Sequence, residues 1–183
     1  PVEWLGTGLR ILDQTRLPRE EVYIETRDYR DVAEAIRTLR ARGAPAIGVA
    51  AGYGVALGAL GIKTKDIRQF RTELDTVFET LAATRPTARN LFQVIERLRD
   101  VAANLNDVAS LKNKLVAEAV AIHKEQLEAD LALAEHGAAL IKPDSVIMTH
   151  CNTGPLATAG YGTALGVIIK AYQMGKVKLV YPT

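Results

Sequence analysis

The sequence predicts an α/β protein that is mostly helical at first and ends in the first βαβ unit of a parallel sheet. Residues 9–26 alternate apolar and polar side chains around a proline-containing turn, which indicates a small antiparallel β element. Residues 32–134 carry apolar side chains at helical spacing. Residues 146–181 then follow the order strand, helix, strand, the unit of a parallel sheet. We therefore expect a helical domain at 1–143 and the start of a second domain at 144–183.

Composition and charge favour a globular protein of one domain or two small ones. The chain has 183 residues with 23 Lys+Arg against 21 Asp+Glu, so its charge gives no indication of nucleic-acid binding. One cysteine excludes an internal disulfide, and three scattered histidines show no metal-ligand spacing. We expect a reducing, cytoplasmic location, with the nucleus as well if the source is eukaryotic, and neither a metal nor a membrane.

The first two strands are expected to pair as a hairpin. Residues 9–15 and 21–26 alternate in polarity, and residues 17–20, Leu-Pro-Arg-Glu, supply the turn between them. Trp4 stands alone near the start of the chain, and we assign it to packing.

Helical spacing begins after the hairpin. Val32, Ile36 and Leu39 mark a helix that should end near residues 42–43. Residues 44–62 are the most apolar stretch of the chain and contain five glycines and a proline. That composition indicates a buried core helix, not a membrane span.

Three further helices are expected. The first spans about 67–81, with Thr64 as its N-cap. The second spans about 91–105. The third spans about 111–134 and should be closed by Gly137, because glycine is the usual residue just past a helix end.

The last part of the chain changes character. Residues 146–148 are apolar and too few for a helix, 156–174 have helical spacing up to Gly175, and 177–181 form a second strand-like run. A single βαβ unit cannot cover both faces of a parallel sheet, and such sheets are normally buried on both sides. We therefore expect the sheet to be incomplete in this chain, with the remainder on a second chain or absent.

Two octapeptides in the sequence are nearly identical. Ala51–Gly58 and Ala159–Gly166 differ at one position, Val55 against Thr163, but their flanks share nothing, so they are not a structural repeat. Glycine inside a helix costs about 1 kcal/mol relative to alanine. We therefore expect two helices against which another backbone packs closely. The glycine spacing differs from the dinucleotide fingerprint, which argues against a nicotinamide cofactor.

Cys151 lies just after the strand at 146–148 and before the helix expected from Pro155. Ligands bind at the carboxyl ends of strands in open α/β sheets, and the N-terminal end of a helix would favour the thiolate. A thiol tuned in this way could exchange a proton near neutral pH. The alternative is a small buried hydrophobe, since free cysteine is among the most buried residue types. His150 and Asn152 flank the thiol and could hold the loop or touch a substrate.

Residues 42–48, Arg-Gly-Ala-Pro-Ala-Ile-Gly, open the apolar helix. Pro45 suits the first helical position, which makes Ala44 the N-cap, and its side chain cannot satisfy the free N–H groups of the first turn. Water or a phosphate must do so, and Arg42 would strengthen a phosphate site. Alternatively, Arg42 is a cation at the end of the preceding helix, with Gly43 as its C′ residue.

A second candidate anion site is the turn at 85–91, Arg-Pro-Thr-Ala-Arg-Asn-Leu. Pro86 would fix the turn, Thr87 would cap the next helix, and Arg85 could reach a phosphate. The alternative is an ordinary surface arginine near a helix start.

Five segments together resemble one known family: 11–18, 42–48, 85–91, 149–154 and 157–166. In order and spacing they are similar to methylthioribose-1-phosphate isomerases. That superfamily also contains ribose-1,5-bisphosphate isomerase and the regulatory subunits of translation initiation factor 2B. The resemblance covers the chain from near Trp4 to Val180.

The resemblance implies an aldose–ketose isomerase that converts 5-methylthioribose 1-phosphate to 5-methylthioribulose 1-phosphate in methionine salvage. It implies a Rossmann-like second domain, a homodimer, and no metal or nucleotide cofactor. By motif position, Cys151 matches the catalytic cysteine, Arg42, Gly43 and Ala44 match the first phosphate-binding segment, and Arg85 matches a second substrate arginine. The catalytic aspartate of the family falls beyond Thr183, so the remaining half, possibly a separate chain, would be needed.

Two alternative functions stay open within the same resemblance. A ribose-1,5-bisphosphate isomerase would need a second anion site where the methylthio group should meet apolar side chains. A non-catalytic regulatory subunit would sense a nucleotide or sugar phosphate without turnover, and it would not need Cys151 together with both arginine motifs.

Overall fold

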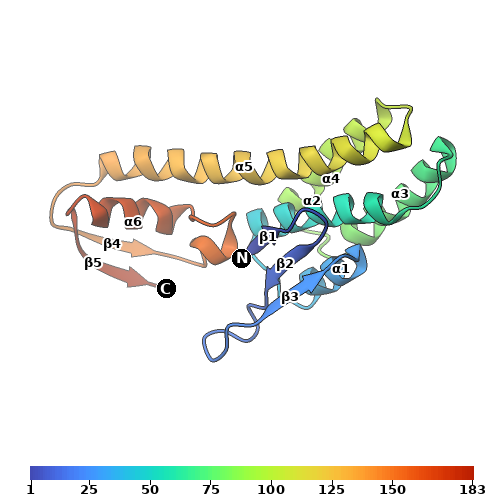
Figure 1. Cartoon of the computed structure of the whole chain (residues 1–183). Coiled ribbons are helices and arrows are strands. Elements are labelled where there is room, and N and C mark those ends of the chain that lie inside the picture. The colour runs from blue at the N-terminus through green and yellow to red at the C-terminus, as the bar shows by residue number, and fades with distance from the viewer.

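A computed structural model describes all 183 residues and shows a mostly helical chain with two small sheets (Figure 1). One sheet is antiparallel and three-stranded, and the other is parallel and two-stranded. The predicted α/β class, with its antiparallel element and terminal βαβ unit, is therefore confirmed. The elements are β1 Val2–Trp4, β2 Leu9–Leu12, β3 Tyr23–Thr26, α1 Tyr29–Arg37, α2 Ala44–Gly61, α3 Ile67–Ala82, α4 Arg89–Ala103, α5 Val108–Leu140, β4 Ser145–Thr149, the 3-10 turn η1 Pro155–Ala157, α6 Ala164–Gln173 and β5 Val177–Pro182.

The predicted hairpin is present, and a third strand joins it. β2 pairs with β3 as expected, and β1 adds to the other edge of β2, with Val2 opposite Ile11. Leu9 and Ile11 are fully buried, so one face of this sheet belongs to the core. Trp4 stacks on Tyr53 of α2 with ring centroids 5.1 Å apart, which confirms the packing role.

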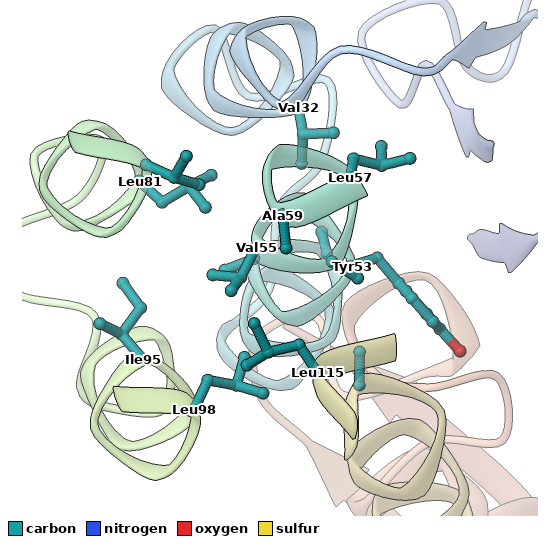
Figure 2. Packing of buried hydrophobic residues seen from close by; sticks show 14 of the residues in the cluster. Val32, Tyr53, Val55, Leu57, Ala59, Leu81, Ile95, Leu98 and Leu115 are labelled. Atoms are coloured by element: carbon teal, nitrogen blue, oxygen red, sulfur yellow. The ribbon is translucent and has the colours of Figure 1, made fainter. Parts of the chain in front are cut away.

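Helix α2 is the centre of the helical core. Figure 2 shows it with side chains of α1, α3, α4 and α5 gathered around it. A helix that is apolar on every face must be buried on every face. By length and composition α2 could cross a membrane, yet 78% of its apolar window is buried among the other helices, as expected of a core helix.

The two similar octapeptides adopt different structures. The first lies inside α2, where a Cβ on Gly58 would come within 2.5 Å of the Val77 side chain, so the close neighbour is a side chain of α3 and not the backbone that was expected. The second is mostly loop, with Gly160 at φ 136° and Gly162 at φ 108°, and only its end is helical. The predicted helix over 156–174 is therefore wrong before residue 164. Positive φ angles are open to glycine and stop a helix.

Three predicted helix ends were misplaced. α1 ends at Arg37, because Leu39 turns into the left-handed region at φ 65°, so Gly43 is not the C′ residue of that helix. The N-cap of α3 is Asp66, whose carboxylate accepts from the Gln69 N–H, and not Thr64. The N-cap of α4 is Ala88, whose side chain makes no capping hydrogen bond, and not Thr87.

Helix α5 is longer than predicted and runs along both parts of the molecule (Figure 1). It passes through Gly137 without ending there. A Cβ at Gly137 would lie 2.6 Å from a methyl group of Val167 in α6, so this glycine allows two helices to approach closely. The residue expected to end the helix is therefore a packing residue inside it.

Strands β4 and β5 pair in parallel, with α6 crossing between them. Ile147 and Val180 are neighbours in register and half-buried. The opposite face of the sheet is apolar and exposed, and its members are Val146, Met148, Leu179 and Tyr181. The division into domains at residue 143 stays a prediction.

Candidate active site

A hollow of about 410 Å³ lies between the start of α2 and the loops that follow β4. The structure thus brings four of the five predicted site residues to one place. The lining residues are Arg42, Gly43, Ala44, Pro45, Cys151, Asn152, Ala157, Thr158 and Thr163.

Cys151 is exposed, so its interpretation as a small buried hydrophobe is wrong. Strand β4 ends at Thr149, and the backbone then turns sharply, with Cys151 at φ 68°, a conformation that non-glycine residues seldom adopt. Such backbone outliers occur most often at functional sites. Its N–H donates to the carbonyl of Thr183 at 3.2 Å, which ties the loop to the end of β5.

The helix N-terminus that was expected to activate the thiol is not directly after it. A 3-10 turn at Pro155–Ala157 follows the loop, and α6 begins only at Ala164. The prediction of a long helix from Pro155 was wrong, so no helix dipole acts on the thiol from that position. The helix that does begin at the hollow is α2.

The start of α2 offers backbone donors to the hollow. Its N-cap is Gly43, not Ala44, and Pro45 occupies the first turn. No side chain caps the helix, and the N–H groups of Ala44 and Ala46 donate to no acceptor of the chain. Because the first N–H groups of a helix have no intrahelical partner and carry partial positive charge, this end suits an anion. The prediction of unsatisfied donors here is confirmed.

At Gly43 the start of α2 lies directly against the loop that follows Cys151. The φ of Gly43 is 98°, and a Cβ built on this glycine would lie 2.4 Å from both Cα and the carbonyl oxygen of Ala157. The two backbones therefore touch directly. The start of α2 and the loop after β4 form one unit at this contact.

Gln14, which was not among the predicted site residues, is a second link between these segments. It is buried, its Nε2 donates to the carbonyl of Leu156 at 2.8 Å, and its Oε1 accepts from Arg42 Nε at 3.3 Å. The side chain thus orients Arg42 while holding the start of η1. Its place in the segment 11–18 was the only sequence signal, and neither hydrophobic periodicity nor charge distinguishes it.

Arg85 is the predicted site residue that does not line the hollow. It lies half-buried in the turn between α3 and α4. The start of α4, just after that turn, lies against the first half of α2, because a Cβ on Gly48 would lie 3.3 Å from the carbonyl oxygen of Asn90. A substrate role for Arg85 stays a prediction.

The two residues beside the thiol differ in position. Asn152 lines the hollow, whereas His150 Nδ1 lies 2.8 Å from the Thr183 hydroxyl. The first is placed to touch a ligand and the second holds the loop to β5.

The charge around the hollow suits an anionic ligand. Arg42 is the only lining residue with a formal charge at neutral pH. The structure contains no group of three or more His, Cys, Asp or Glu side chains that could hold a metal ion. Residues with a thiol, a guanidinium and free backbone donors therefore line the same hollow.

Comparison with known proteins shows the family of the chain. Residues 40–183 match the model of the initiation factor 2 subunit family. The chain belongs to that family. A methylthioribose-1-phosphate isomerase of Dehalococcoides mccartyi is 57% identical over 175 residues, which cover 96% of this chain and 52% of that protein.

Two solved structures are also similar. The 5-methylthioribose 1-phosphate isomerase of Pyrococcus horikoshii has a TM-score of 0.92 and 36% identity, covering 98% of this chain and 51% of that one. The translation initiation factor eIF-2B subunit delta of A. fulgidus has a TM-score of 0.87 and 38% identity, covering 98% and 53%. The chain thus spans about half the length of the relatives that it matches.

Proposed function

We propose that the protein contributes this hollow to an isomerase that converts 5-methylthioribose 1-phosphate to 5-methylthioribulose 1-phosphate. The observation that carries the proposal is the meeting of Cys151 with Arg42 and the uncapped start of α2 across one hollow. The relative that is 57% identical bears the name of this enzyme. Methionine salvage is the metabolic context that this substrate implies.

The chemistry explains why an anion site and a proton donor lie together. Phosphate on C1 blocks ordinary opening of the sugar ring, so the ring C1–O bond must break while the phosphate stays in place. Arg42 and the N–H groups of α2 hold the phosphate, with Arg85 as a second arginine. Cys151 supplies a proton to the ring oxygen or takes one back. Hydrogen then moves from C2 to C1 while the C2 hydroxyl loses its proton, which replaces the proton given to the ring oxygen and leaves the ketone at C2.

The complete enzyme needs residues beyond this chain. We propose that β4, α6 and β5 begin a Rossmann-like sheet that the remaining C-terminal half completes, as part of the same polypeptide or as a separate chain. That half would supply the catalytic aspartate and cover the exposed apolar face of β4 and β5. We further propose a homodimer in the cytoplasm that works without a metal or nucleotide cofactor.

A second candidate function is a non-catalytic subunit like the archaeal eIF-2B delta, whose structure is 38% identical. It would bind a phosphorylated ligand in the same hollow without turnover. An isomerase acting on ribose 1,5-bisphosphate is the third candidate.

Turnover by the complete product of the gene tests these alternatives. The purified protein, with its intact mass recorded, would be incubated separately with 5-methylthioribose 1-phosphate and ribose 1,5-bisphosphate. We expect ketose formation from the methylthio sugar, lost in Cys151→Ala. Conversion of the bisphosphate alone would favour the third candidate, and binding without conversion of either sugar would favour the subunit.

A further inference from the structure

Two side chains of α5 reach the loop that forms one wall of the hollow. His123 and Asp130 are seven residues apart, two helical turns, so they lie on one face of α5. Their partners are Ala159 and Gly162, on either side of Gly160 and Tyr161 in this loop. The proposed function uses neither side chain.

Asp130 is in an environment that packing alone does not explain. It is 1% exposed and lies within 4 Å of no cationic group. Its carboxylate accepts from Gln126 Nε2 at 2.9 Å and from the Gly162 N–H at 3.4 Å. Burying a carboxylate without a cation is costly, and an apolar side chain would suit a helix interface better. Here only two hydrogen bonds offset that cost, and one of them goes to the loop.

Gly162 connects Asp130 to the loop that carries the thiol. With φ at 108°, a Cβ on Gly162 would lie 2.9 Å from the Thr153 carbonyl oxygen and 3.0 Å from Gly154 Cα. The next N–H, that of Thr163, donates to the same Thr153 carbonyl at 2.8 Å. The backbone of Gly162 therefore lies between Asp130 and residues 153–154. These two residues belong to the loop that carries Cys151, 150–154, which we call the cysteine loop.

His123 holds the other side of the same loop. Its Nε2 lies 3.1 Å from the Ala159 carbonyl oxygen, which can only accept, so Nε2 carries the proton. In the neutral ring Nδ1 then accepts from the Tyr53 hydroxyl at 2.9 Å. Burial raises the pKa of Tyr53 to about 12, so the phenol keeps its proton. The ring is thereby fixed between the core helix α2 and the loop.

We propose that His123 and Asp130 are positioning residues that hold the segment 158–163 against the cysteine loop and so set the shape of the hollow. The consequence for turnover rests on the proposed function, but the restraint on the loop does not. Each side chain acts through a single hydrogen bond to the loop backbone, and neither touches the substrate.

Four variants of the complete gene product separate hydrogen bonding from charge and packing. Asp130→Ala and His123→Phe remove the bonds to the loop. Asp130→Asn keeps an oxygen for the Gly162 N–H, because Gln126 can turn its amide to accept from the new NH₂ group. His123→Gln keeps a donor for Ala159 and an acceptor for Tyr53.

Hydrogen exchange of a peptide covering 158–165 is the first measurement, because it needs no activity. We expect amide exchange about ten-fold faster in Asp130→Ala and His123→Phe, the effect of one lost hydrogen bond on a local opening equilibrium. Exchange should stay near the original rate in Asp130→Asn and His123→Gln. A peptide from α3, 67–82, is the internal control and should not change.

Kinetics with 5-methylthioribose 1-phosphate is the second measurement. We expect kcat/KM to fall about ten-fold or more in the first two variants and to recover in the two conservative ones. Unchanged exchange in Asp130→Ala and His123→Phe would overturn the proposal, as would conservative variants as impaired as the others. If the unmodified protein turns over neither sugar, the proposed function fails, while the exchange result still decides whether the loop is held as described.

Discussion

Gly43→Ala is the substitution that should disturb the hollow most directly, because this glycine joins its two walls. The new methyl group would lie 2.4 Å from the Ala157 backbone, whereas carbon atoms in ordinary contact are separated by about 3.5 Å. The backbones must therefore separate by about 1 Å. A displacement of about 1 Å in a catalytic arrangement can cost about 100-fold in rate. We expect kcat/KM for 5-methylthioribose 1-phosphate to fall by about that factor.

The same substitution should also lower stability. A non-glycine residue at φ 98° adds strain of about 1–3 kcal/mol, and Tm falls by about 2–4 °C per kcal/mol in a chain of this size. Thermal unfolding and steady-state kinetics would be measured on the complete gene product. Two matched controls separate the steric clash from the backbone strain. In Gly61→Ala the new methyl group meets no atom within 4 Å and the φ angle is not positive, so neither effect is present. In Gly175→Ala the backbone is strained at φ 71°, but the methyl group makes no clash. Kinetics in Gly43→Ala like those of Gly175→Ala would refute the argument.

Three further predictions concern the thiol, the second arginine and the packing of α5. Cys151→Ala should abolish turnover without lowering Tm, because the side chain is exposed; near-normal kcat would remove the thiol from the chemistry. Arg85→Ala should raise KM for the phosphorylated sugar, with exposed Arg68→Ala as control; an unchanged KM and kcat would exclude Arg85 from the site. Gly137→Ala should lower Tm, because its methyl group would lie 2.6 Å from Val167. Such overpacking lowers the free energy of unfolding by about 1–3 kcal/mol, whereas the higher helix propensity of alanine raises it by about 1 kcal/mol. A higher Tm would show that α6 can move aside.

Patterns that depend on neighbours in sequence predicted much of this structure. The all-apolar composition of 44–62 predicted a buried central helix, and residues 146–181 predicted a parallel βαβ unit; both are present. The unsatisfied N–H groups at the start of α2 were predicted from Ala44 and Pro45 alone. These features depend on residues that are close together in the chain, so they can be predicted from a single sequence.

Features that depend on distant contacts were missed. Gly137 has the sequence signature of a helix end, but contact with α6 makes it an interior residue. Residues 159–166 resemble part of α2, yet positive φ at two glycines makes them mostly loop. Gln14 and Asp130 act through hydrogen bonds to backbone groups far along the chain, and no periodicity reveals such partners.

The position of the phosphate in a crystal structure with 5-methylthioribulose 1-phosphate tests the proposed site most directly. We expect the phosphate oxygens to accept from the free N–H groups of Ala44 and Ala46 and from the Arg42 guanidinium, with the sugar carbons beside the Cys151 thiol. A phosphate bound elsewhere, with only water at the start of α2, would contradict the assignment of this hollow as the substrate site.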